Sequence, residues 1–276
     1  MQNAGMAALG LNWRYLAFDV DPSQLREAIT GARVMGFVGL NLTVPHKLLA
    51  LNLVDALDPG AKAWGAVNTI RFEGREPTGV WKPIWNFSSS PPEMRACGFN
   101  TDGEAIIQSL REDLGFEPVG KRVLLLGAGG AGRVAALRLA AANVAQLFLT
   151  NRTIQKAEEI ARDISGRFPK VKVEIGYPPA EVDLILNATS LGLKAADELP
   201  LDRTKLPLRK AAAVYDMIYR PAETPLLRAA RAAGCRVANG IGMLLHQGAT
   251  ALELWSGLKA PITVMRDALV KNVYGT

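Results

Sequence analysis

The stretch KRVLLLGAGGAG, residues 121–132, decides the fold. Its continuous apolar run is typical of a strand buried in a parallel sheet, and the glycines after it come just before a helical stretch that reaches Ala142. Glycines in this position let the backbone approach a pyrophosphate that is held by helix amides. We therefore predict a dinucleotide-binding loop; the alternative is a glycine-rich turn with a structural role alone. The predicted loop residues are Gly127, Ala128, Gly129, Gly130, Ala131 and Gly132.

The residues after this loop alternate strictly between strand and helix. Such alternation predicts parallel βαβ units and a Rossmann-type sheet. The predicted strands are 146–152, 170–175, 183–190, 211–219 and 235–240, the predicted helices between them are 154–164 and 224–234, and two further helical stretches, 242–258 and 262–273, come after the last strand.

The end of the strand at 146–152 predicts which cofactor the loop binds. An NAD-specific site places an acidic residue there, which binds the ribose 2′-hydroxyl. Here the residues are Asn151, Arg152 and Thr153, with Lys156 one turn later. An arginine fork with a neighbouring ammonium and hydroxyl would bind a 2′-phosphate, so we predict NADP(H). The alternative is that Arg152 and Lys156 are ordinary solvated charges at a helix start, although the helix dipole disfavours cations there.

Residues 13–115 also alternate between β-rich runs and helical patterns, so a second α/β unit is expected. Asp21 or Ser23 can cap the first helix, and Pro45 occupies the favoured first turn of the second. The segment 75–97 holds four prolines and a serine triplet, which predict a long loop or partly disordered insertion without a core pattern. The predicted strands are 13–20, 37–44 and 63–73, and the predicted helices are 23–30 and 45–57.

A capping box from Thr101 to Glu104 starts a further helix, which Gly115 ends. A chain of 276 residues suits two modest domains, and we expect this helix to join them. The expected domains are a substrate domain at residues 1–102, a nucleotide-binding domain at 103–238, and C-terminal helices at 239–276 that pack back on the substrate domain.

Composition and charge argue against several classes of protein. The chain is 49% hydrophobic and 21% charged, as in ordinary globular proteins, and it lacks an uncharged apolar stretch of membrane-spanning length. The only cysteines, Cys97 and Cys235, and the only histidines, His46 and His246, suit neither a disulfide framework nor a metal site. The net charge of +6 favours anionic partners, but scattered basic residues argue against nucleic acid. We expect a cytoplasmic protein that binds a small molecule, is independent of metal and membrane, and is a monomer or homodimer.

Reduction of a carbonyl by hydride needs a positioned proton donor, and two residues are candidates. Lys47 lies in the first turn after Pro45, where the helix dipole disfavours a cation; a solvated lysine is the alternative. Asp102 is the weaker candidate when it is considered alone, because an acid in the first turn stabilises a helix and needs no catalytic role to explain it. We therefore take Lys47 and Asp102 as candidate catalytic residues.

Eight motifs together resemble the shikimate dehydrogenase family, in order and approximate spacing, over almost the whole chain. They are NLTVPHK at 41–47, GAVNT at 65–69, NTDG at 100–103, GAGGAG at 127–132, NRT at 151–153, NATS at 187–190, YDMIY at 215–219 and QGA at 247–249.

This resemblance implies an α/β fold of two domains, an N-terminal α/β substrate domain and a Rossmann-type NADP-binding domain, with a deep cleft between them. It also implies the NADP-dependent reduction of 3-dehydroshikimate to shikimate in aromatic amino-acid (chorismate) biosynthesis, without a metal. By the same resemblance, Lys47 is the acid/base residue and Asp102 shares its hydrogen-bond network. Implied substrate contacts are Thr43, Asn68, Tyr219 and Gln247, and further implied cofactor contacts are Asn187, Thr189, Met217 and Gly240.

The resemblance fails at the start of the chain. Members of the family begin with a strand and a Ser-x-Ser segment before the equivalent of Met1, and both are absent here. In the family this strand lies between the equivalents of 13–20 and 37–44, so its loss should leave unpaired backbone groups in the sheet. We therefore expect Met1 to be internal to a longer natural chain.

Three alternatives stay open. A quinate/shikimate dehydrogenase would perform the same chemistry with a broader substrate range, often with NAD. A catalytically silent NADP-binding paralogue is favoured if Met1 is the genuine start. A different NADP-dependent reductase on a similar fold would explain the cofactor loop but not the N-terminal motifs.

Overall fold

The computed structural model describes residues 1–194 and 196–275 of the 276-residue chain. Two compact units are present: residues 1–102 with 247–272, and residues 103–246 with 273–276. The first division falls where the sequence predicts a domain boundary, after residue 102. The second falls inside a C-terminal helix, so residues 239–246 lie with the second unit.

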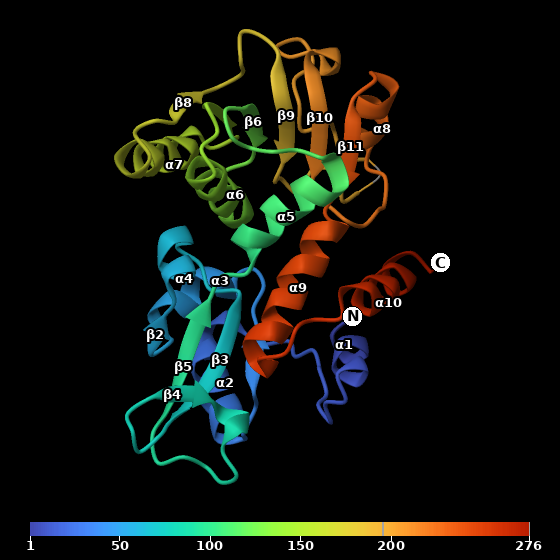
Figure 1. The fold of residues 1–276 in the computed structure, drawn as a ribbon. Helices are drawn as coiled ribbons and strands as arrows, with labels where there is room; N and C mark the ends of the chain where they lie inside the picture. Colours follow the sequence, from blue (N-terminus) through green and yellow to red (C-terminus); the bar gives the residue numbers. More distant parts are fainter. Residues whose placement is uncertain (195, 276) are drawn as a thin grey trace. The chain divides into compact units, whose positions relative to one another are not determined.

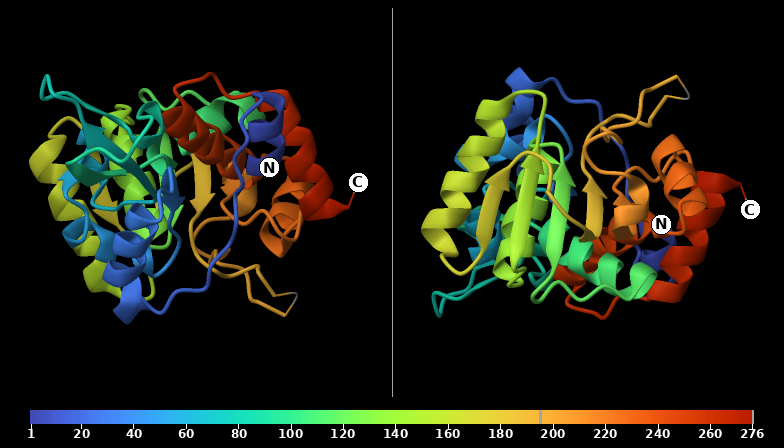
Figure 2. Two further views of the ribbon diagram at one scale, coloured as in Figure 1. Left: turned by 90° about the horizontal axis from the view of Figure 1, so that it is seen from below. Right: turned by 90° about the horizontal axis from the view of Figure 1, so that it is seen from above.

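The second unit is built on a sheet of six parallel strands in the order β11-β10-β9-β6-β7-β8 (Figures 1 and 2). Helix α7 packs against β7 and β8, and α8 packs against β10 and β11. The predicted Rossmann-type alternation of this region is therefore confirmed. Its elements are α5 (Asp102–Leu114), β6 (Arg122–Leu126), α6 (Gly130–Ala141), β7 (Gln146–Thr150), α7 (Ile154–Arg167), β8 (Lys172–Ile175), β9 (Val182–Asn187), β10 (Ala211–Asp216), α8 (Pro225–Ala232) and β11 (Arg236–Asn239).

The Glu104 half of the capping box predicted for α5 does not form, because Thr101 N donates to Asn68 Oδ1 at 2.8 Å. The helix begins at Asp102, and Gly115 follows its end with φ of +58°, as predicted. However, both carboxylate oxygens of Glu104 accept hydrogen bonds from Arg138, at 2.9 and 2.8 Å. A two-point bond to a guanidinium is stronger than one bond to a backbone N–H, which explains why the arginine takes the carboxylate.

The first unit has a mixed five-stranded sheet. Strand β3 lies between β1 and β5, and β5 also pairs with β2. Strand β4 pairs with the C-terminal end of β3, at Glu73 to Arg75, whereas β1 pairs with its N-terminal end. Buried side chains from α2, β3 and β5, among them Leu25, Ile70 and Phe72, form the core of this unit. Its elements are α1 (Gln2–Ala8), α2 (Leu25–Val34), β1 (Gly39–Asn41), α3 (His46–Leu49), β2 (Ala56–Leu57), α4 (Pro59–Trp64), β3 (Thr69–Arg75), β4 (Trp81–Pro83), β5 (Met94–Phe99), most of α9 (Ile241–Ser256) and most of α10 (Ile262–Tyr274), with short 3-10 turns at Pro22–Gln24, Ala50–Asn52 and Ile84–Asn86.

The strand predicted at 13–20 is wrong. This segment pairs with no strand among the described residues, and the side chains of Leu16 and Phe18 are exposed. A strand needs a neighbouring strand for its backbone groups, and here side-chain bonds serve that purpose instead. The backbone N–H of Tyr15 donates to Asn3 Oδ1 at 2.7 Å, and Asn3 Nδ2 donates to the Tyr15 carbonyl at 3.0 Å.

Three other predicted elements differ from the structure. The strand predicted at 37–44 forms only at Gly39–Asn41, and the strand predicted at 63–73 begins only at Thr69. The helix predicted at 45–57 is α3 with a 3-10 turn that ends at Asn52, and it is followed by strand β2 and the unpredicted helix α4. Asp58 caps this helix by accepting from Gly60 N and Ala61 N, and Gly65 ends it in the left-handed conformation.

The sequence suggested that the insertion at 75–97 is a long loop without a core pattern, but the structure shows strands within it. It contains β4 and, at its C-terminal end, most of β5, and the prolines do not prevent this, because Pro83 lies in an edge strand. The guanidinium carbons of Arg75 and Arg95 lie 5.8 and 4.4 Å from the ring centre of Trp81. Trp85 donates its indole N–H to the carbonyl of Trp255.

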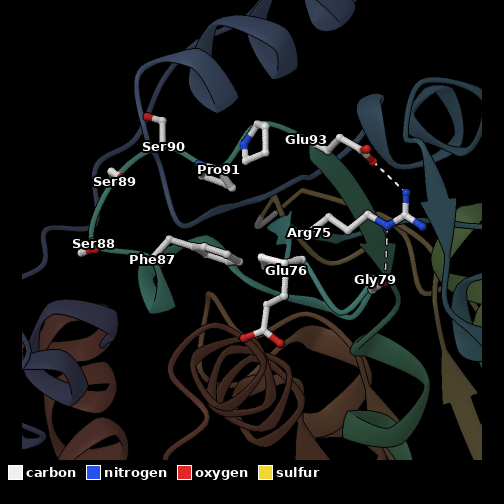
Figure 3. A pocket seen from close by; sticks show the side chains of 11 residues that line it. Arg75, Glu76, Gly79, Phe87, Ser88, Ser89, Ser90, Pro91 and Glu93 are labelled. Atoms are coloured by element: carbon white, nitrogen blue, oxygen red, sulfur yellow. Dashed lines mark hydrogen bonds and ion pairs between the residues drawn. The ribbon is translucent and has the colours of Figure 1, made fainter.

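Figure 3 shows a shallow pocket within this insertion, with the serine triplet on its rim. The Arg75 guanidinium there is already occupied, by Glu93 at 3.0 Å and by the Gly79 carbonyl at 3.4 Å. All of the lining residues lie between 75 and 93, so the pocket contains none of the predicted site residues.

The part of the C-terminal helices at residues 247–272 packs on the first unit. Trp255 Nε1 in α9 donates to the carbonyl of Ile70 in β3 at 2.9 Å, and α1 contacts both C-terminal helices where Gly5 meets Leu252 and Met265. None of the described helices is both long and apolar enough to cross a membrane.

Candidate active site

The first unit brings Lys47 and Asp102 together. Lys47 lies in the short helix α3 and Asp102 is the first residue of α5, 55 residues later. Lys47 Nζ donates to Asp102 Oδ2 at 2.8 Å. The Lys47 side chain is 27% exposed and that of Asp102 is 9% exposed, so the ammonium can reach a ligand while the carboxylate is largely enclosed. An ammonium held in this way can donate a proton to a ligand oxygen.

Asn68 holds the other carboxylate oxygen of Asp102. Its Nδ2 donates to Asp102 Oδ1 and to Thr101 Oγ1, both at 2.9 Å, and its Oδ1 accepts from Thr101 N at 2.8 Å. Asn68 is only 1% exposed. Its amide therefore fixes Asp102 from inside the unit, and a substrate contact by Asn68 stays a prediction.

The other predicted substrate contacts lie in both units. Thr43 is exposed in the turn before α3, and Gln247 is half-buried in the part of α9 that belongs to the first unit. Tyr219 is 39% exposed and belongs to the second unit. The structure thus places Thr43 and Gln247 in the same unit as Lys47, and Tyr219 with the nucleotide-binding elements.

The glycine-rich loop in the second unit has the form that a pyrophosphate site needs. Gly127 has φ of +100°, and a Cβ on Gly132 would lie 2.1 Å from the Gly127 carbonyl oxygen, so the turn requires glycine at both positions. A Cβ on Gly129 or Gly130 would meet nothing within 4 Å. The start of α6 at Gly130 is therefore open to a ligand, and its first backbone N–H groups can bind an anion.

The residues after β7 suit a 2′-phosphate. Asn151 links this segment to the glycine-rich loop, because its Oδ1 accepts from Ala128 N at 3.0 Å and its Nδ2 donates to the Thr153 carbonyl at 2.8 Å. Arg152 and Lys156 are exposed, and their side chains have no hydrogen-bond or ion-pair partner among residues 1–194 and 196–275. Two uncompensated cations beside a nucleotide loop fit the third phosphate of NADP.

A buried polar cluster organises the loops that follow β9 and β10. Asn187 and Asp216 are both fully buried, and Asn187 Nδ2 donates to Asp216 Oδ1 at 2.9 Å. Asn187 Oδ1 accepts from the backbone and hydroxyl of Thr189, and Thr224 Oγ1 donates to Asp216 Oδ2 at 2.7 Å. Asn187 therefore shapes the loop from within, which leaves the exposed parts of this loop for any cofactor contact.

Met217 and Gly240, both predicted to line the cofactor, lie against each other. A Cβ on Gly240 would lie 2.0 Å from the Met217 carbonyl oxygen. Any side chain at position 240 would therefore displace the backbone that carries Met217. This close approach explains why glycine is needed at position 240, whether or not it contacts the cofactor.

Reasoning from the sequence gave no role to Asp216 and Thr224, which hold the loops after β9 and β10. Asp216 appears in the motif at 215–219 but received no role. The signal was present in the sequence, because an acid that directly ends a buried apolar strand must find partners within the protein.

We expect Asp216 to make the stability of the second unit depend on pH. Burial raises the pKa of this carboxyl above its usual value, although Thr224, Ile218 N and Asn187 donate hydrogen bonds to it. A group whose pKa rises on folding stabilises the protein below its unfolded pKa, and this contribution is lost as the pH rises through the folded pKa. The melting temperature of Asp216→Asn minus that of the wild type should therefore increase from about pH 4 to about pH 7. The exposed acid Asp267, changed to asparagine, is the control, and a difference that stays constant with pH would contradict the expectation.

Comparison with known proteins identifies the family. The family models described as "Shikimate dehydrogenase substrate binding domain", "Shikimate / quinate 5-dehydrogenase" and "Shikimate 5'-dehydrogenase C-terminal domain" match residues 1–70, 111–195 and 240–270. The shikimate dehydrogenase (NADP(+)) of Geobacter metallireducens is 41% identical over 274 residues, which cover 96% of this chain and 88% of that protein. The chain belongs to the shikimate dehydrogenase family. The family expected from the eight motifs is thus confirmed.

Solved structures show the same fold in shikimate dehydrogenases and in a reductase with another name. The shikimate 5-dehydrogenase of Thermus thermophilus, in complex with NADP(H) and shikimate, has a TM-score of 0.79 and 32% identity, with 98% of this chain and 92% of that chain covered. The 5-ketofructose reductase of Gluconobacter sp. strain CHM43 has a TM-score of 0.81 and 34% identity, with 99% and 92% covered. Substrate specificity in this fold therefore depends on the residues of the site.

Proposed function

We propose that this chain is an NADP-dependent shikimate dehydrogenase, which catalyses the reversible reduction of 3-dehydroshikimate to shikimate in chorismate biosynthesis. The observation that carries the proposal is the Lys47–Asp102 pair, held at 2.8 Å and fixed by Asn68 within the motifs that define the family. The NADP-dependent enzymes among its relatives, with 41% identity for that of Geobacter metallireducens, support the same reaction and cofactor.

Lys47 and Asp102 would act as the catalytic pair. NADPH, when bound, supplies the hydride for the reduction. The Lys47 ammonium donates a proton to the substrate oxygen in this direction, and the neutral amine accepts it in the reverse direction. Asp102 keeps the amine in place through its Oδ2, while Asn68 occupies its Oδ1. The two oxygens of one carboxylate thus have separate tasks.

The remaining predicted residues would bind the ligands. Thr43, Asn68, Tyr219 and Gln247 offer hydroxyl and amide groups that suit the hydroxyls of a polyol carboxylate. For NADP(H) we propose the loop Gly127 to Gly132 at the pyrophosphate, Asn151, Arg152, Thr153 and Lys156 at the 2′-phosphate, and Thr189, Met217 and Gly240 near the nicotinamide, with Asn187 as the support of that loop. The two units would then be a substrate domain and a nucleotide-binding domain, with residues 239–276 assigned to the C-terminal helices.

We also infer a cytoplasmic location and a small-molecule partner. Cys97 and Cys235 are buried and unpaired, as is usual for proteins of a reducing compartment. Burial raises the pKa of the Cys97 thiol to about 11, so this cysteine is a poor nucleophile and has no place in the proposed mechanism.

The test is reduction of NADP⁺ by shikimate, followed through the absorbance of NADPH, with quinate and NAD⁺ as competing substrate and cofactor. We expect activity with shikimate and NADP⁺ that greatly exceeds activity with quinate or NAD⁺. Comparable rates with quinate would identify a quinate/shikimate dehydrogenase instead. Tight NADP⁺ binding without turnover of either substrate would favour a catalytically silent paralogue, and reduction of another ketone by NADPH would favour a different reductase.

A further inference from the structure

A run of hydrogen bonds leads from Asp102 into the sheet of the first unit. Asn68 Nδ2 donates to Asp102 Oδ1 at 2.9 Å, and Thr69 Oγ1 donates to Asn68 Oδ1 at 3.1 Å. Asn41 Nδ2 donates to Thr69 Oγ1 at 2.9 Å, and Tyr15 Oη donates to Asn41 Oδ1 at 3.0 Å. All of these donors are arranged in one direction, from Tyr15 toward Asp102.

The direction of the run is fixed by a backbone group. Thr101 N can only donate, and it lies 2.8 Å from Asn68 Oδ1, so the oxygen of the amide faces Thr101 and the nitrogen faces Asp102. Thr69 reinforces this orientation. Its hydroxyl accepts from Asn41 and therefore has its own proton free for Asn68, although it also lies 3.5 Å from Thr101 Oγ1.

Strand pairing places these groups. Thr69 is the first residue of β3 and Asn41 is the last residue of β1, and the two are directly opposite each other in the register of these strands. Thr69 is 0% exposed and Asn68 is 1% exposed. Water therefore cannot replace a bond that is lost here, and an amide without its partner would reorient or lose its hold on Asp102.

Tyr15 closes the outer end of the run. Its ring lies 6.2 Å from the ring of Trp255, and burial raises the pKa of its hydroxyl above the usual value of 10.0. The hydroxyl is therefore protonated at any working pH and stays a donor to Asn41. The orientation of the Asn41 amide is fixed by the backbone carbonyl of Asn68, which can only accept and lies 3.3 Å from Asn41 Nδ2, so the nitrogen faces Thr69 and the oxygen faces Tyr15.

We propose that Thr69 and Asn41 are positioning residues for the reaction: they lock the Asn68 amide, the amide locks the Asp102 carboxylate, and the carboxylate holds the Lys47 ammonium. The proposal rests on the proposed function, because it assigns a purpose to the same site. Neither residue needs to touch the substrate. Their effect is on the placement of the proton donor, and misplacement by even about 1 Å can cost a large factor in rate.

The test compares three variants of neighbouring residues in β3. Thr69→Val keeps the shape of the side chain but removes the hydroxyl, Thr69→Ser restores the hydroxyl, and Ile70→Val is a matched control that reduces a fully buried side chain outside the run. We expect kcat to fall about tenfold in Thr69→Val, with the KM for NADP⁺ unchanged. Thr69→Ser should recover most of the rate, and Ile70→Val should lower the melting temperature without lowering kcat.

Asn41→Asp is a second variant of the run, in case Thr69→Val does not fold. A carboxylate at this position accepts from Tyr15 but cannot donate to Thr69, so the Thr69 proton gains a competing acceptor. We expect kcat to fall several-fold, in the same range as for Thr69→Val. A wild-type rate in Asn41→Asp, with the protein folded, would overturn the proposal.

A second readout does not depend on activity. The rate at which an acetylating reagent modifies Lys47, measured by peptide mass spectrometry without substrate, reports how firmly Asp102 holds the amine. This rate should rise about threefold in Thr69→Val and stay at the wild-type value in Thr69→Ser and Ile70→Val.

The two readouts separate the possible failures. If Thr69→Val resembles Ile70→Val in both kcat and labelling, the hydroxyl has only a structural role and the proposal is overturned. If the wild type does not turn over shikimate but the labelling pattern holds, the proposed function fails and the positioning of Lys47 stands.

Discussion

Changing Lys47 to alanine should lower kcat for shikimate oxidation about a thousandfold, which is within the range that a positioned acid or base contributes. The residue supplies the only amine that contacts Asp102 among the described residues, and its side chain is 27% exposed, so it can meet a ligand. The variant leaves Asp102 with its bonds from Asn68, which should preserve the fold of the site. The measurement is steady-state kinetics with NADP⁺ and shikimate.

The control for this prediction is Lys62→Ala, which removes an exposed lysine from α4 of the same unit. It should change kcat by less than about twofold, because surface charges contribute little. The dissociation constant of NADP⁺ should be unchanged in both variants. If Lys47→Ala keeps more than about a tenth of the wild-type kcat, another group is the proton donor.

Replacing both Arg152 and Lys156 by alanine should weaken NADP⁺ binding about a hundredfold and change NAD⁺ binding less than about threefold. A hydrogen bond to a charged group contributes about 1.5 to 3 kcal/mol, and the exposed position of both side chains reduces this for each of them. The two cofactors differ only by the 2′-phosphate, so the difference between them isolates the contribution of these cations. Fluorescence titration with each cofactor provides both constants.

Arg162→Ala is the matched control for the cofactor, since it removes an exposed arginine from the same helix, α7. It should leave the affinity for NADP⁺ within about twofold, apart from a weak effect of net charge. If the Arg152 and Lys156 variant loses affinity for NADP⁺ and NAD⁺ equally, the two residues support the fold of the loop and do not recognise the phosphate.

The second unit could be predicted almost strand by strand, and the reason is physical. Its central strands are buried parallel strands, so they appear in the sequence as continuous apolar runs such as Val123 to Leu126, separated by glycines and helix caps. The first unit gave a weaker signal, because its strands are short and mixed in direction. A β-rich run at 13–20 is compatible with a strand, but only the three-dimensional structure shows whether a partner lies beside it.

The candidate site was predicted in part. Lys47 was a candidate because a cation at a helix start is disfavoured, and Asp102 because an acid there is favoured. The family resemblance then gave both residues roles. Thr69 and Asn41 lie in two of the eight motifs but received no role, because a polar residue at a strand end is ordinary and their pairing depends on the register of β1 against β3. Glu104 shows the opposite error: its local pattern predicted a cap, but Arg138, 34 residues away, binds it.

After β7, one residue supports the nucleotide loop and two others are free to bind a ligand, and this separation has an evolutionary consequence. Asn151 is bonded to the nucleotide loop, whereas Arg152 and Lys156 have no partner among the described residues. If these cations bind the 2′-phosphate as proposed, mutations at the two positions should alter the choice between NADP and NAD without disturbing the scaffold. Among descendants of one ancestral dehydrogenase, the electron carrier should therefore change more readily than the architecture that binds it, and a designer could exchange it with very few substitutions.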